Sequence, residues 1–103
     1  MNFQRFVTAT VLALATASEA HANANAIEKA RNAHREAMEA LEDCRSAWTQ
    51  DSRRAAAKTI EEKGVYLALS LNPISRYGDE QGRMLEEVTA ALKECAAIAY
   101  PES

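Results

Sequence analysis

The sequence predicts an all-α protein: a three-helix antiparallel bundle with a long first helix and one interhelical disulfide. Three observations lead to this fold class. Residues 21–63 contain neither Gly nor Pro, the two residues that most often interrupt helices. Apolar side chains recur at intervals of three and four along most of the chain. Cys44 and Cys95 fall on two of these apolar stripes, which is where a disulfide between two helices requires them.

The first helix is defined by one long apolar stripe. Its members recur every three or four residues: Ile27, Ala30, His34, Ala37, Leu41, Cys44 and Trp48. The opposite face carries charged side chains and is expected to be solvated. Residues 49–52 interrupt the helix-forming composition, and Asp51 or Ser52 is a candidate cap for the next helix.

A second helix is predicted from about Arg53 to Asn72, where Pro73 ends it. It places four apolar residues on one face: Ala56, Ile60, Leu67 and Leu71. Residues 65–71 could also form a short strand, but the chain offers no second strand to pair with it, which favours the helix. Gly64 lies inside this helix and weakens it by about 1 kcal/mol relative to Ala.

A third helix is predicted from Asp79, as its cap, to about Ala99, with Pro101 beyond its end. Its apolar residues again recur every three or four positions: Met84, Val88, Ala91, Cys95 and Ile98. Leu85 and Leu92 widen this stripe.

The first twenty residues have the pattern of a secretory signal peptide. Arg5 gives a positive start, residues 6–17 are uncharged and mostly apolar, and small residues follow at Ser18 and Ala20. The apolar stretch is shorter than the roughly 20 residues that span a bilayer. Cleavage is expected after Ala20, Ala22 or Ala24.

We therefore expect residues 1–20 to be a cleaved signal peptide and residues 21–103 to form a single small helical domain, periplasmic or secreted and without membrane insertion. The exported part keeps the net charge of -3 of the whole chain, because Arg5 and Glu19 leave together. A nucleic-acid binder normally carries a basic excess, so this balance argues against that class.

Both cysteines lie in the part expected to be exported, and an even number of cysteines in such a chain is typical of a disulfide. Closing the chain from Cys44 to Cys95 would stabilise the fold by about 4 kcal/mol on the chain-entropy estimate. Neither cysteine has other Cys or His residues near it in the sequence, so no metal site is expected. Pairing between two chains is the alternative.

Residues for catalysis are not arranged in any recognisable pattern. His34 lies on the apolar stripe, and His21 is too far from it along a helix to complete a copper site. The sequence has no Gly-x-Ser-x-Gly turn and no phosphate-binding glycine loop. We therefore expect a protein that is not an enzyme and uses no cofactor.

Three features are candidates for binding. The loop of residues 72–82 is long for so small a bundle and presents residue types that are frequent at interfaces: Ile74, Arg76 and Tyr77. The long apolar stripe of the first helix could leave surface for another chain. Arg53 and Arg54 begin a small basic patch with Lys58, interpreted as an exposed helix start. The sequence thus favours a protein-interaction module that binds another protein or a second copy of itself.

The layout resembles the HdeA-like family of small periplasmic acid-stress proteins. The residues that carry the resemblance are Cys44 with nearby Trp48, the apolar segment 64–71, and Cys95 followed by Pro101. The resemblance implies a helical periplasmic chaperone (a holdase) that responds to acid. Envelope immunity proteins, which neutralise a toxin, fit the same layout and are a further alternative.

Overall fold

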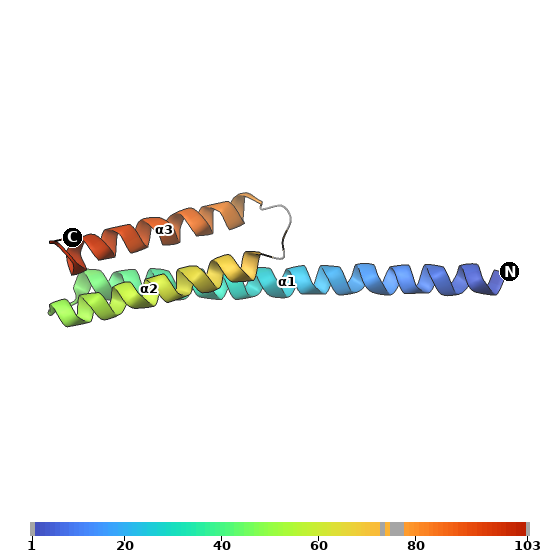
Figure 1. Ribbon diagram of the computed structural model, residues 1–103, viewed down its shortest axis with the longest axis horizontal. Helices are drawn as coiled ribbons and strands as arrows, with labels where there is room; N and C mark the ends of the chain where they lie inside the picture. Colours follow the sequence, from blue (N-terminus) through green and yellow to red (C-terminus); the bar gives the residue numbers. More distant parts are fainter. Residues whose placement is uncertain (1, 73, 75–77, 103) are drawn as a thin grey trace.

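Three helices pack side by side in the computed structural model shown in Figure 1. They are α1 (Asn2–Ser46), α2 (Gln50–Leu71) and α3 (Asp79–Ala99). The chain reverses direction after α1 and again after α2, so α2 is antiparallel to both other helices and α1 runs parallel to α3. The predicted all-α bundle with a long first helix is confirmed, and residues 65–71 are helical.

The structure describes residues 2–72, 74 and 78–102, and their side chains from residue 24 onward. The side chains of the predicted signal peptide, residues 1–20, and of the cleavage position Ala22 lie outside this part, so export stays a prediction. Among the described residues, no helix combines the length and the apolar character needed to cross a membrane.

The core of the bundle is built largely from alanine. Half of its buried apolar residues are Ala30, Ala33, Ala37, Ala40, Ala56, Ala57, Ala91 and Ala99. The largest fully buried side chains besides the cysteines are Ile60, Leu67 and Leu71, all from α2. Because an alanine removes little apolar surface from water, the core stabilises the fold only modestly. A domain of this size then depends on further stabilisation, here from a disulfide.

The start of α2 differs from the prediction. The helix begins at Gln50, and the hydroxyl oxygen of Thr49 accepts a hydrogen bond from the backbone N–H of Ser52 at 3.1 Å. Neither Asp51 nor Ser52 is the cap. The prediction was wrong because it assigned Thr49 to the interruption, although a threonine side chain can cap a helix in the same way.

The start of α3 differs in a similar way. Asp79 is the first residue of the helix, and Gly78 before it is the cap residue. Gly78 has no side chain to offer, but its backbone N–H donates to Oε1 of Gln81 at 2.8 Å. Gln81 therefore supplies the half of a capping box in which a side chain reaches back to the cap residue.

Gly64 has a packing role in the interior of α2. A Cβ atom at this position would lie 3.3 Å from Cγ1 of Val88 on α3, closer than most side-chain contacts. Glycine thus permits a close approach of α2 and α3, which accounts for a residue that disfavours helices in the middle of one.

Two residues of the predicted apolar stripes lie on the surface. Trp48 is 96% exposed because α1 ends at Ser46, before the stripe would bring the indole onto the core. Ile98, in the last turn of α3, is 41% exposed. The other members of the α3 stripe, from Met84 to Cys95, are buried as predicted.

Candidate functional site

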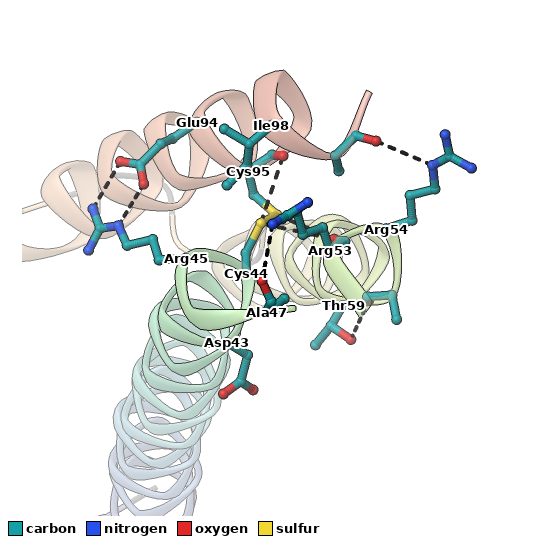
Figure 2. Close-up of a disulfide and its surroundings, with 12 residues drawn as sticks. Asp43, Cys44, Arg45, Ala47, Arg53, Arg54, Thr59, Glu94, Cys95 and Ile98 are labelled. Atoms are coloured by element: carbon teal, nitrogen blue, oxygen red, sulfur yellow. Dashed lines mark hydrogen bonds and ion pairs between the residues drawn. A yellow bond between two sulfur atoms is a disulfide. The ribbon is translucent and has the colours of Figure 1, made fainter. Parts of the chain in front are cut away.

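The predicted disulfide joins Cys44 of α1 to Cys95 of α3, which confirms the pairing within one chain. Both cysteines are fully buried. The backbone carbonyl oxygen of Arg53 on α2 lies 3.6 Å from Sγ of Cys95, so all three helices meet at this bond. Figure 2 shows the disulfide between its two helices, with Arg53 beside it and Arg45 reaching Glu94 on the other side.

Both arginines of the predicted basic patch have structural partners, although Arg54 is exposed as predicted. Arg53 is half-buried, and its guanidinium donates to Oε1 of Gln50 at 2.6 Å and to the carbonyl oxygen of Ala47 at 3.2 Å. These bonds fix the turn between α1 and α2. Only Lys58 of the predicted patch remains without a role in the described contacts.

Arg54 binds the carboxyl end of α3. Its Nε donates to the carbonyl oxygen of Ala99 at 3.2 Å, and its guanidinium carbon lies 5.2 Å from the centre of the Tyr100 ring. The side-chain nitrogen of Gln50 donates to the same carbonyl at 3.1 Å. The first turn of α2 therefore binds the carbonyl groups that the end of α3 leaves free.

Three glutamates spaced seven residues apart tie α3 to α1. Glu80 and Glu94 each accept two hydrogen bonds from one guanidinium: Arg31 donates to Glu80 at 2.7 and 3.0 Å, and Arg45 donates to Glu94 at 2.6 and 2.9 Å. Between these pairs, Nε2 of His34 lies 2.5 Å from Oε2 of Glu87. The charged face of α1 is exposed as predicted, but its Arg31 and Arg45 also bind this glutamate row (Glu80, Glu87 and Glu94).

The arginine partners change the acidity of these carboxyl groups. The hydrogen bonds from Arg31 lower the pKa of Glu80 below its ordinary value, and those from Arg45 do the same for Glu94. A hydrogen bond from Lys63 of α2 likewise lowers the pKa of Glu36 on α1. Interhelical contacts thus favour the charged form of carboxyl groups on two of the three helices.

An apolar groove of about 300 Å³ lies between α2 and α3. One of its lining residues, Glu61, is charged; the others are Ile60, Gly64, Val65, Leu67, Ala68, Leu85, Val88, Thr89 and Leu92. On the α2 side, Val65 is 56% exposed, and Leu69, one turn further along, is 66% exposed. We call Val65 and Leu69 the α2 ridge. Large apolar side chains exposed beside an apolar groove are typical of a binding surface.

The groove was not predicted, although the sequence contains one signal for it. Val65 and Leu69 are four residues apart, the spacing of side chains on one helix face. They are offset from the stripe of Ile60, Leu67 and Leu71 that fills the core. A second apolar stripe on a helix whose first stripe is already buried indicates a second contact surface.

The predicted loop surface is described only in part. Ile74 is half-buried and packs against the core, and its backbone N–H donates to the carbonyl oxygen of Leu71 at 3.0 Å. Arg76 and Tyr77 lie outside the described residues. The role of this loop in binding therefore stays a prediction.

Metal binding finds no support in the described part of the chain, where no three His, Cys, Asp or Glu side chains are grouped as ligands. His34, the one histidine whose side chain is described, contacts a single carboxylate. The comparisons identify no relative: no family model matches the chain, and neither does any curated protein or solved structure.

Proposed function

We propose that the protein is a non-enzymatic protein-binding module that acts in the periplasm or outside the cell, and that the groove between α2 and α3 is its binding surface. The observation that carries this proposal is the pairing of an apolar groove with the exposed α2 ridge. An isolated bundle would lose nothing by placing polar residues at these positions, whereas a binding surface needs apolar ones.

The disulfide supports the proposed compartment. Bonds of this kind persist in oxidising surroundings such as the periplasm and are rare in the cytosol. The bond between Cys44 and Cys95 is fully buried, so it fits a structural role better than exchange with another thiol. Together with the signal-peptide pattern of residues 1–20, it favours export.

The binding surface can be tested by photocrosslinking in the source cell. A photoreactive phenylalanine analogue replaces Val65 in one variant and Ile98 in a matched control, because both are exposed apolar residues and only Val65 lines the groove. We expect discrete crosslinked species from position 65 and none from position 98. Absence of any species specific to position 65 would contradict the proposed binding surface.

A second candidate function, the acid-responsive holdase that the HdeA-like layout implies, is favoured by the glutamate row. Protonation of Glu80 and Glu94 removes the charged partners of Arg31 and Arg45 and so weakens the contact of α3 with α1. Light scattering of an aggregating client protein over a pH series distinguishes the two functions. A holdase suppresses aggregation only in acid, whereas a specific binding module leaves the scattering curve unchanged at every pH.

A further inference from the structure

We draw no further inference here: the strongest candidate, the apolar groove between α2 and α3 that the exposed Val65 helps to line, belongs to the surface already proposed for binding, and nothing in the structure shows what covers it.

Discussion

Removing the disulfide should cost this protein most of its stability. The bond joins residues 51 positions apart, and the chain-entropy relation gives about 4 kcal/mol for a loop of that length. The core that remains is half alanine, and the whole free energy of unfolding of so small a domain is about 4 to 8 kcal/mol. For a domain of this size each kcal/mol shifts the melting temperature by roughly 4–8 °C, so we expect a decrease of about 20 °C.

The assay compares thermal melts of the wild type, with and without reductant, and of the double variant Cys44→Ala/Cys95→Ala. Replacing both cysteines leaves no free thiol to pair between chains, and alanine introduces no buried polar group. The reduced wild type and the double variant should both melt early, and reductant should have no effect on the variant. If reduction leaves the wild-type melting temperature within a few degrees of its oxidised value, the reasoning from loop closure is refuted.

Further predictions concern helix packing, acid and a helix end. Gly82→Ala should raise the free energy of unfolding by about 0.5–1 kcal/mol, because no atom lies near the added methyl group. Gly64→Ala should raise it by less, because the added methyl group would press on Val88. Urea unfolding measures both changes. The lowered pKa of Glu94 stabilises the fold above the ordinary value of 4.5, and this contribution is lost as the pH falls through the folded-state pKa. Stability should therefore fall in acid, and Glu94→Gln should flatten that dependence in unfolding curves recorded from pH 7 to pH 3. Arg54→Ala should lower the free energy of unfolding by about 1 kcal/mol, because the carbonyl oxygen of Ala99 loses a donor and the Tyr100 ring loses its cation. A melting temperature equal to that of the wild type would show that these contacts of Arg54 contribute nothing.

Much of the fold follows from patterns that a sequence displays directly. The end of α3 at Ala99 and the helical state of residues 65–71 depend on local spacing and on where Pro and Gly occur, and both agree with the structure. The burial of Cys44 and Cys95 follows from their places on two apolar stripes. Trp48 shows the limit of this reasoning. The stripe continued to it in the sequence, but the helix ended two residues earlier, and spacing has no meaning beyond a helix end.

The glutamate row could not be inferred from the sequence, because it depends on how two helices are aligned. Local rules pair Arg31 with Glu28 and Arg45 with Glu42 along α1, and both contacts occur, at 4.0 and 2.7 Å. The stronger paired hydrogen bonds go to α3, about fifty residues away along the chain. They require α1 and α3 to be parallel and in one register, which the connection through α2 and the disulfide determine together.

The groove between α2 and α3, like the glutamate row, depends on how each helix is rotated about its own axis. The side of α3 that carries the glutamate row faces α1, and Val88 of α3 faces Gly64 of α2. Leu85 and Leu92 therefore lie along the outer edge of the contact between α2 and α3. On α2, burial of Ile60 and Leu67 leaves Val65 exposed on that same outer edge. The two helices therefore present Val65, Leu85 and Leu92 along one common edge. Leaving that edge uncovered would keep apolar surface in water in a bundle whose core is half alanine, and this is the physical reason to expect a partner there.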